Sequence, residues 1–575
     1  MKARMAERIS SLKVMAFAAA MLCLALAVSA REPVSAKHAM AASNHPIASA
    51  VGAEIMKKGG NAVDAAIATG FALAVVYPEA GNIGGGGFMV IRMADGRSIA
   101  IDYREMAPAA ATRDIYLNEK GDVISGEGGP VTGYRASGVP GTVAGFELAF
   151  KKYGSGKLKW AELVEPARKL AAEGYVLSRR LAELFKAYSS RLENYEDSKR
   201  IFLNGGEYFE PGDRLVQKDL AATLERIRDK GAEGFYQGTT AKLIADDMAR
   251  NNGLITLDDL KNYKAVERKP IEGSYRGSKI ISMPPPSSGG IVLVQVLNML
   301  ERHDLRSLGH NSADKYHLLI EAMKRAFADR AELLGDPDFN DVPTEQLIDK
   351  SYAAQRAKSI SKGKATPSSE LGAGIQVGNE PQDTTHYSVV DKDGNVVSNT
   401  YTTNNLYGSA VTAKGTGIIL NDEMDDFASK PGVPNIFGLV QGEFNAVGPG
   451  KRPLSSMTPT IVLRPDGSFW FEVGARGGPR IISASLQTVI NVIDHGMDLE
   501  DAVNAPRVHH QWLPDEVIYE PYGMSPDTIK ILESYGHKFA SSPRSIASAT
   551  AVGIDKEGYR LGVVDKRADG AAVGY

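Results

Sequence analysis

The chain has 575 residues, of which 43% are hydrophobic and 23% are charged, and its formal net charge is −3. These values are typical of a soluble globular protein, and they give no reason to expect nucleic acid or an anionic membrane as a partner. The length exceeds that of one ordinary domain, although a single large multilayer α/β domain with insertions is possible.

Residues 1–30 have the pattern of a secretory signal peptide. Val14–Val28 is an apolar run, and Val28-Ser29-Ala30 supplies small residues before a cut after Ala30. The run is about fifteen residues, which is short for a membrane span of about 20 residues, so an uncleaved anchor is the less favoured alternative. We therefore expect a periplasmic or secreted protein without a stable membrane span. Four basic residues precede the apolar run, namely Lys2, Arg4, Arg8 and Lys13.

Cys23 is the only cysteine, and it lies inside this apolar run. Met21-Leu22 does not fit the small residue that precedes a lipoprotein cysteine. The mature chain is therefore expected to contain no cysteine, which excludes disulfides, thiolate metal sites and a cysteine nucleophile.

The first mature elements are predicted to be a helix and a hairpin. Asn61 is a suitable N-cap for a helix over Ala62–Val75. The glycine-rich run Gly81–Gly87 leads from helix into strand, the opposite order to a phosphate-binding P-loop, so we interpret it as tightly packed backbone. Phe88–Met93 and Ser98–Tyr103 form the predicted hairpin.

Arg104 leaves that hairpin four residues before Pro108 and is a candidate for binding a carboxylate, since a guanidinium group matches a carboxylate with two hydrogen bonds. Residues 140–335 are predicted to be mostly helical. The clearest helix covers Ser312–Leu334, where apolar residues recur on one face.

A second hairpin begins at Thr384, after a polar stretch that ends at Asp383. Its strands are predicted over Thr384–Val390 and Val396–Thr402, with a turn at Asp393-Gly394 between them. If the chain were cut before Thr384, the threonine hydroxyl and the new α-amino group would belong to one residue. A nucleophile and its base would then lie together, because an α-amino group has a pKa of about 7.7–8.0. Taken alone, paired threonines more often reflect β-propensity.

Several further motifs follow this hairpin. They are Asn421–Phe427, a Pro/Gly-rich loop over Pro431–Gly442, the run Lys451–Thr460, a hairpin turning at Asp466-Gly467, and Gly474–Gly478. The neighbouring His509 and His510 point in different directions on a strand, and the chain has no HExxH spacing, so we predict no metal site.

Taken together, these segments resemble the γ-glutamyltransferase (γ-glutamyltranspeptidase, glutathione hydrolase) family of N-terminal nucleophile hydrolases. The resemblance extends from about Ala36 to Tyr575 and rests on motifs in the family's order. These motifs are Tyr103–Pro108, Thr384–Ser388, Met424–Phe427, Arg452–Met457 and Gly477-Gly478.

The resemblance implies an α+β fold, the four-layer αββα sandwich of these hydrolases, formed by two subunits cut from one precursor. Self-cleavage would fall between Asp383 and Thr384, giving a large subunit of residues 31–383 and a small subunit of residues 384–575 that stay together as a heterodimer. Thr384 would be the nucleophile, with its α-amino group as base, and Thr402 would orient it. Gly477 and Gly478 would supply the N–H groups of the oxyanion hole.

The resemblance also implies how a γ-glutamyl group is held. Its α-carboxylate would bind Arg104, Ser455 and Ser456, and its α-ammonium would bind Asn404, Glu423 and Asp426, with Thr402 and Gly478 completing the substrate site. Water, an amino acid or a peptide would then resolve the acyl-enzyme. Glutathione and other γ-glutamyl compounds are the implied substrates, and this chemistry requires no cofactor.

Two positions depart from common family patterns. Several bacterial members have glutamine where this chain has Glu423, and the extra carboxylate favours an ammonium. Phe437 stands in the loop that resembles the family's lid, where tyrosine is common, so a hydroxyl is lost.

Two alternatives stay open: an acylase for glutaryl side chains, which lack the ammonium that Asp426 would bind, and a γ-glutamyl-binding protein that never matures.

Overall fold

The computed structural model describes residues 32–371 and 384–575. The expected signal segment, with Cys23, and Asp383 of the expected cleavage site lie outside the described residues. All the elements below belong to one unit, Val34–Tyr575.

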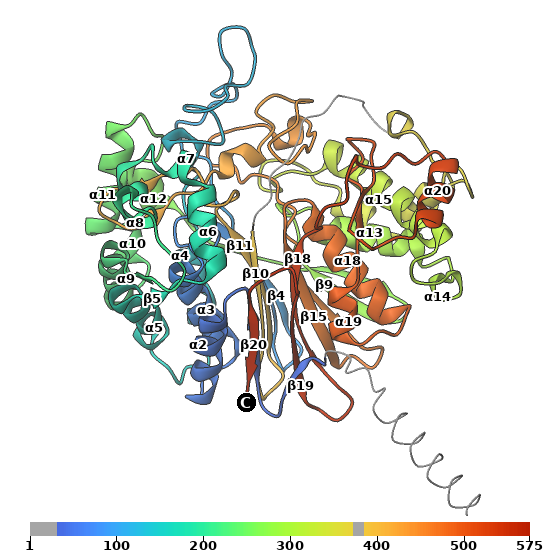
Figure 1. Ribbon diagram of the computed structural model, residues 1–575, viewed down its shortest axis with the longest axis horizontal. Coiled ribbons are helices and arrows are strands. Elements are labelled where there is room, and N and C mark those ends of the chain that lie inside the picture. The colour runs from blue at the N-terminus through green and yellow to red at the C-terminus, as the bar shows by residue number, and fades with distance from the viewer. Residues whose placement is uncertain (1–31, 372–383) are drawn as a thin grey trace, which may run out of the picture. The chain divides into compact units, whose positions relative to one another are not determined.

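Two antiparallel sheets pack face to face at the centre of this unit (Figure 1). One has the order β20 (Ala571–Gly574), β2 (Met40–Ser43), β10 (Thr385–Val390), β11 (Val396–Thr402), β3 (Gly86–Arg92), β4 (Ser98–Tyr103) and β7 (Val266–Arg268). The other has the order β1 (Val34–Ala36), β19 (Arg560–Val564), β18 (Ser548–Ile554), β15 (Phe469–Arg476), β14 (Thr460–Leu463), β9 (Ser278–Ser282) and β8 (Ile271–Tyr275).

Helices cover the outer face of each sheet (Figure 1). The layer on the β10 sheet contains α2 (Pro46–Lys57), α3 (Ala62–Val76), α4 (Thr142–Tyr153), α5 (Trp160–Glu173), α6 (Arg179–Ala187), α7 (Ser189–Leu192), α8 (Glu196–Phe202), α9 (Lys218–Lys230), α10 (Glu233–Tyr236), α11 (Gly238–Arg250) and α12 (Leu257–Asn262). The layer on the β15 sheet contains α13 (Gly289–Leu300), α14 (Leu305–Leu308), α15 (Ala313–Leu333), α16 (Thr344–Leu347), α17 (Lys350–Ala357), α18 (Arg480–Ile493), α19 (Leu499–Asn504) and α20 (Pro526–Ser534). The expected αββα sandwich is confirmed.

Three short strand pairs lie outside the two large sheets. They are β5 (Tyr175–Val176) with β6 (Arg214–Leu215), β12 (Thr412–Ala413) with β13 (Ile418–Ile419), and β16 (Val508–His509) with β17 (Ile518–Tyr519). Residues 140–335 are mostly helical, as predicted, but this stretch also supplies β5–β9, which the helical pattern did not reveal.

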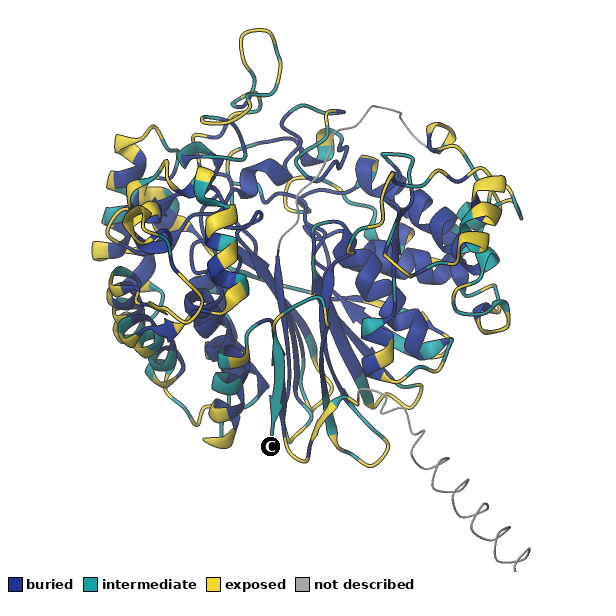
Figure 2. Cartoon of the chain, in the orientation of Figure 1, coloured by how far each residue is buried: buried dark blue, intermediate teal, exposed yellow. Residues whose placement is uncertain are grey.

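The central hairpin is stable because the alternating side chains of β10 match the different surroundings on the two faces of this strand. Tyr387 and Val389 point into the apolar layer beneath α3, whereas His386 and Ser388 point toward the other sheet. There the His386 ring bonds Glu472 at 2.8 Å. Both faces are buried (Figure 2), so a shift of one residue would place polar groups in the apolar layer, and the register is fixed.

The helix start predicted from the capping residue Asn61 is confirmed. The Asn61 side chain accepts hydrogen bonds from the backbone N–H groups of Val63 and Asp64 and begins α3. Ser312 caps α15 in the same way through the N–H of Lys315. α3 packs directly on β10 of the central sheet, whereas α15 packs against α13 in the outer helical layer.

The described segment before Thr384 ends at Leu371 and is held down by buried polar groups. The Lys324 ammonium donates to the carbonyl of Thr366. The Trp512 indole donates to the carbonyl of Ser368 at 2.8 Å, and the Ser368 N–H donates to the Asp515 carboxylate at 3.0 Å. The chain is therefore held in place at Ser368, sixteen residues before Thr384.

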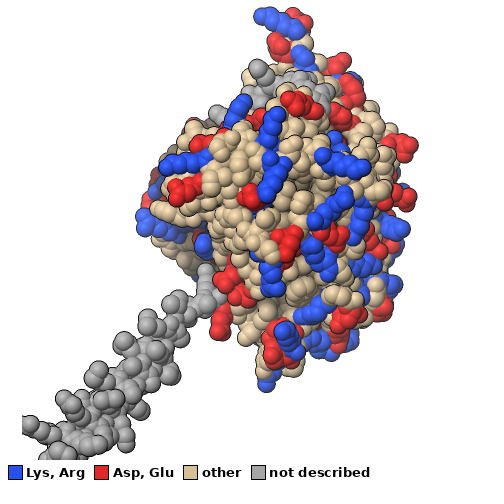
Figure 3. All heavy atoms as spheres, turned by 90° about the vertical axis from the view of Figure 1, so that its right-hand side faces the viewer, with Lys and Arg blue, Asp and Glu red and all other residues tan. Residues whose placement is uncertain are grey.

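Acidic and basic side chains are interspersed over the face formed by the α14 and α20 side of the molecule (Figure 3). This mixture agrees with the small net charge of −3. Among the described residues, none of the helices combines the length and the apolar character needed to cross a membrane.

Candidate active site

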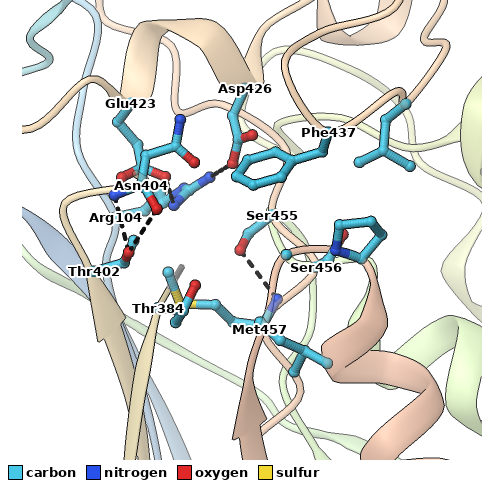
Figure 4. Close-up of a pocket in the computed structure, with 14 residues that line it drawn as sticks. Arg104, Thr384, Thr402, Asn404, Glu423, Asp426, Phe437, Ser455, Ser456 and Met457 are labelled. Atoms are coloured by element: carbon cyan, nitrogen blue, oxygen red, sulfur yellow. Dashed lines mark hydrogen bonds and ion pairs between the residues drawn. The ribbon is translucent and has the colours of Figure 1, made fainter. Parts of the chain in front are cut away.

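A small pocket opens where the strands of the central hairpin end (Figure 4). Of the predicted site residues that the structure describes, it contains all except Gly477, together with Phe437. Its walls are formed by Arg104, Thr384, Thr402, Asn404, Glu423, Asp426, Phe437, Leu439, Ser455, Ser456, Met457, Gly478, Pro479 and Ile481.

Thr384 and Thr402 lie at the same end of the hairpin. Thr385 of β10 pairs with Tyr401 of β11, so the residues just beyond this pair, Thr384 and Thr402, are neighbours across the two strands. Both are nearly fully buried. The Thr402 hydroxyl accepts the backbone N–H of Asn404 at 2.9 Å, which orients its oxygen within the pocket.

Asn404 turns the chain after β11. Its φ of +78° lies in the left-handed region, which asparagine adopts more readily than most residues. Its side-chain amide donates to the backbone carbonyl of Asp422 at 3.0 Å. This contact connects the end of β11 to the 3₁₀ turn η4 (Glu423–Asp426), which carries both predicted ammonium-binding carboxylates.

The opposite charges of the pocket are paired with one another. The guanidinium group of Arg104 is fully buried and forms ion pairs with Glu423 and Asp426, while its Nε donates to the carbonyl of Pro453 at 3.2 Å. Sequence reasoning assigned these groups to different ends of a substrate and did not foresee their direct contact (Figure 4).

Burial and ion pairing shift the pKa values of these groups in opposite directions. Burial raises the pKa of Glu423 and of Asp426, and the nearby Arg104 opposes the rise. For Arg104, burial lowers the pKa, but the attraction of Glu423, Asp426 and Glu105 outweighs it and the pKa is raised. The guanidinium therefore stays charged, while the carboxylates depend on a nearby cation for their own charge.

Glu105 and Arg330 extend this charged cluster and were not identified from the sequence. Glu105 is fully buried, 3.8 Å from Arg104, and burial raises its pKa to about 7 against the pull of Arg104. Arg330 of α15 donates to the Ser456 hydroxyl at 3.3 Å and to the Ser288 hydroxyl at 2.9 Å. Arg330 lies 42 and 126 residues from these two serines in the sequence, so no local motif marked it, whereas Glu105 lies beside Arg104 within the Tyr103–Pro108 motif.

Replacing Glu105 by glutamine is expected to reduce the pH dependence of stability. The pKa of Glu105 is about 7 in the folded chain and about 4.3 in an unfolded one, so the folded state binds the extra proton between these values. The stabilisation of the folded state by this group is complete below about pH 4 and is lost as the pH rises through 7, by roughly 4 kcal/mol at about 1.4 kcal/mol per pKa unit. Urea midpoints at pH 5 and pH 8 should therefore differ less in Glu105→Gln than in the unmodified chain. Equal differences would contradict the assignment.

Ser455 and Ser456 form the wall opposite η4. The backbone N–H of Ser455 donates to the carbonyl of Pro286 at 2.8 Å, and its hydroxyl accepts the N–H of Met457 at 3.1 Å. The loop before α13 thus holds Ser455 on both sides, because the N–H of Ser288 also donates to the carbonyl of Ser455 at 2.8 Å.

Gly477 and Gly478 connect β15 to α18. Their φ angles of +134° and +55° lie in the region that favours glycine. Gly478 lines the pocket, and a Cβ atom there would come within 2.8 Å of the Phe437 ring. A Cβ atom on Gly477 would meet Ala547 at 2.9 Å. Side chains at either position would therefore disturb the backbone for which the family resemblance implies an oxyanion-hole role.

Phe437 belongs to the loop over Pro431–Gly442 and is buried against Gly478. Its backbone carbonyl accepts the side-chain amide of Gln511 at 3.1 Å. The ring faces into the pocket between Asp426 and Ser455 (Figure 4). The loop thus covers the pocket with an apolar ring that has no hydroxyl, as predicted from the sequence.

The adjacent histidines have ordinary buried partners. His509 bonds the Ser483 hydroxyl at 2.7 Å and Gln511 at 2.9 Å, and His510 lies 3.3 Å from the Asp515 carboxylate. Within residues 32–371 and 384–575, no cluster of three or more His, Cys, Asp or Glu residues could hold a metal ion.

Comparisons with known proteins agree on the family. The family model described as Gamma-glutamyltranspeptidase matches residues 48–575. The glutathione hydrolase proenzyme of Escherichia coli (strain K12) is 52% identical over 545 residues, covering 94% of this chain and 93% of that protein. The Acylase ACY 1 proenzyme of Pseudomonas sp. (strain V22) is 40% identical, with 94% of each chain covered.

Solved structures extend the same likeness to three dimensions. The cephalosporin acylase from Bacillus halodurans superposes with a TM-score of 0.83 at 28% identity, covering 95% of this chain and 97% of that one. The Helicobacter pylori gamma-glutamyltranspeptidase superposes with a TM-score of 0.56 at 50% identity, covering 57% of this chain and 94% of that one. On the family model, the identities and the shared fold, the chain belongs to the γ-glutamyltranspeptidase family of enzymes.

Proposed function

We propose that the protein is a self-processing γ-glutamyltransferase and glutathione hydrolase that cuts itself between Asp383 and Thr384. The observation that carries this proposal is the pocket itself. It unites a threonine at the start of a strand with one buried guanidinium and two carboxylates, a set of charges that complements the zwitterionic end of a γ-glutamyl group. The glutathione hydrolase proenzymes among the relatives support the same reading.

In turnover, the Thr384 hydroxyl would attack the γ-carbonyl carbon while the residue's own α-amino group takes the proton. The N–H groups of the Gly477-Gly478 segment would stabilise the oxyanion, a contribution worth about 2.7–4 kcal/mol per donor in comparable enzymes. Loss of the amine leaving group gives an ester on Thr384. Water, an amino acid or a peptide then attacks this ester, which gives hydrolysis or transfer from one intermediate.

Substrate binding would exchange charge partners within the pocket. The α-carboxylate would take Arg104, assisted by Ser455 and Ser456, and the α-ammonium would take Asp426 and Glu423, assisted by Asn404. Each buried charge then keeps an opposite charge beside it. A ligand without the ammonium would leave the carboxylates without a cation, which is costly in a buried site.

Self-cleavage would produce a large subunit of residues 31–383 and a small subunit of residues 384–575 that remain a heterodimer. The proenzyme names of the relatives support this maturation. We also propose that residues 1–30 direct export to the periplasm or beyond. The support for export is the sequence pattern of these residues.

An acylase acting on glutaryl side chains is the second candidate. The Acylase ACY 1 relatives and the fold shared with a cephalosporin acylase favour it. Glu423 and Asp426 argue against it, because a glutaryl group offers them no cation. Comparing γ-glutamyl and glutaryl p-nitroanilides as substrates separates the two candidates directly.

The first experiment is the intact mass of the purified protein under denaturing conditions. At the chain's mean of about 107 Da per residue, the two subunits should weigh about 38 kDa and about 21 kDa. The smaller species should begin with Thr384. A single chain that stays uncut on incubation would instead favour a γ-glutamyl-binding protein that does not mature.

A further inference from the structure

Asn435 connects the predicted ammonium site to the tip of the loop over the pocket. Its side-chain amide donates to the Asp426 carboxylate at 3.2 Å. Its side-chain carbonyl accepts the backbone N–H groups of Phe437 at 3.0 Å and of Leu439 at 3.1 Å. One amide group therefore joins a charged pocket residue to the two loop residues that line the same pocket.

This arrangement fixes the loop tip together with two backbone hydrogen bonds, from the Asn435 N–H to the Leu439 carbonyl at 3.2 Å and from the Gly438 N–H to the Asn435 carbonyl at 2.9 Å. The Asn435 carbonyl closes an Asx-type turn over Phe437, and Gly438, at a φ of +68°, completes it. Outside this turn, the Ile436 N–H donates to Asp425 at 3.0 Å and the Phe437 carbonyl accepts from Gln511 at 3.1 Å. The position of the Phe437 ring over Gly478 thus depends on Asn435.

We propose that Asn435 is a positioning residue that makes the placement of Phe437 over Gly478 depend on the cation that Asp426 holds. The inference rests on the proposed function, in which Asp426 receives the α-ammonium of a γ-glutamyl group. It adds that the loop distinguishes ligands that carry this ammonium from ligands that lack it.

The loop would distinguish these ligands because ligand binding changes which cation lies beside Asp426. Any ligand with the α-carboxylate competes for Arg104 and so removes the cation that Asp426 holds in this structure. A γ-glutamyl group returns a cation, its ammonium, and Asp426 stays ionised and remains a strong acceptor for Asn435. A glutaryl group returns none and leaves Asp426 with only the attraction of Arg330; because burial raises the pKa of Asp426, this carboxylate then takes up a proton more readily and accepts the Asn435 amide less strongly.

The test is Asn435→Ser, assayed with γ-glutamyl p-nitroanilide and glutaryl p-nitroanilide. Serine can still accept the Phe437 N–H but is too short to reach Asp426. Losing a hydrogen bond to a charged group should lower kcat/KM for the γ-glutamyl compound by roughly 10- to 100-fold. The value for the glutaryl compound should fall far less. In an Asp426→Asn background, Asn435→Ser should have little further effect on the γ-glutamyl compound.

Val433→Ala is the matched control, because Val433 lies in the same loop with an exposed side chain. It should leave the ratio of the two kcat/KM values unchanged. Equal losses on both substrates in Asn435→Ser, or losses that multiply with Asp426→Asn, would overturn the inference and make Asn435 an ordinary loop residue. An unmodified enzyme without γ-glutamyl activity would instead refute the proposed function.

A second measurement needs no variant and covers the case in which Asn435→Ser fails to mature. Hydrogen exchange is followed in the peptide that contains Phe437 and Leu439, with saturating L-glutamate or saturating glutarate. Exchange should slow with L-glutamate and slow much less with glutarate. Equal protection by the two ligands would overturn the inference.

Discussion

Thr384→Ala is expected to leave one uncut chain with no turnover. Both self-cleavage and catalysis use the Thr384 hydroxyl in the proposed mechanism, and alanine removes it while preserving the buried strand start. Loss of a nucleophile of this kind costs about six orders of magnitude in kcat in a comparable hydrolase. Denaturing electrophoresis and a γ-glutamyl p-nitroanilide assay measure the two effects separately.

Thr384→Ser is the control for this variant, since serine keeps a hydroxyl at the same position. It should mature and turn over, although with altered rates. A Thr384→Ala protein that still appears as two chains and remains active would place the nucleophile elsewhere. Thr402 and Thr385, the nearest hydroxyl groups on the hairpin, would then be the next candidates.

Asp426→Asn is expected to weaken γ-glutamyl substrates far more than glutaryl ones. The variant keeps the shape of the side chain but removes the charge that would pair with the α-ammonium. Breaking a buried ion pair typically costs 3–5 kcal/mol, which predicts a fall in kcat/KM of roughly 100- to 5000-fold for the γ-glutamyl compound. Steady-state kinetics with the two p-nitroanilides give the comparison.

Asp425→Asn provides a matched control beside it. Asp425 is buried and accepts the Ile436 N–H, but it does not line the pocket, and burial raises its pKa strongly. An amide is therefore a close replacement for its protonated carboxyl group, and the preference between the two substrates should stay the same. Equal losses on both substrates in Asp426→Asn would show that Asp426 does not recognise the ammonium.

Elements that depend on residues close together in the sequence could be predicted from local sequence signals. The central hairpin followed from alternating residues and a turn at Asp393-Gly394, and β10 and β11 occupy nearly the predicted ranges. The start of α3 followed from Asn61, whose side chain bonds N–H groups two and three residues away. The composition of the site followed from motifs whose order resembles one family.

Long-range contacts could not be predicted in this way. Arg104 meets Glu423 across 319 residues of sequence, and no local pattern indicates that the pocket's charges pair with one another. Strands β8 and β9 lie within a mostly helical stretch and form because β14 supplies a partner from far along the chain. Asn435 stands in a polar loop, and only the folded chain reveals that its amide reaches Asp426.

The order of strands in the two sheets has a consequence for the processed protein. A cut before Thr384 would assign β2, β3, β4 and β7 to one product and β20, β10 and β11 to the other, yet β10 lies between β2 and β11 in a single sheet. The second sheet is divided in the same way, with β1, β8 and β9 on one side of the cut and β14, β15, β18 and β19 on the other. The two products therefore cannot separate without losing both sheets. Folding of the precursor joins strands of one chain, whereas refolding after the cut requires two chains to meet, so recovery from denaturation becomes dependent on concentration once the protein has matured.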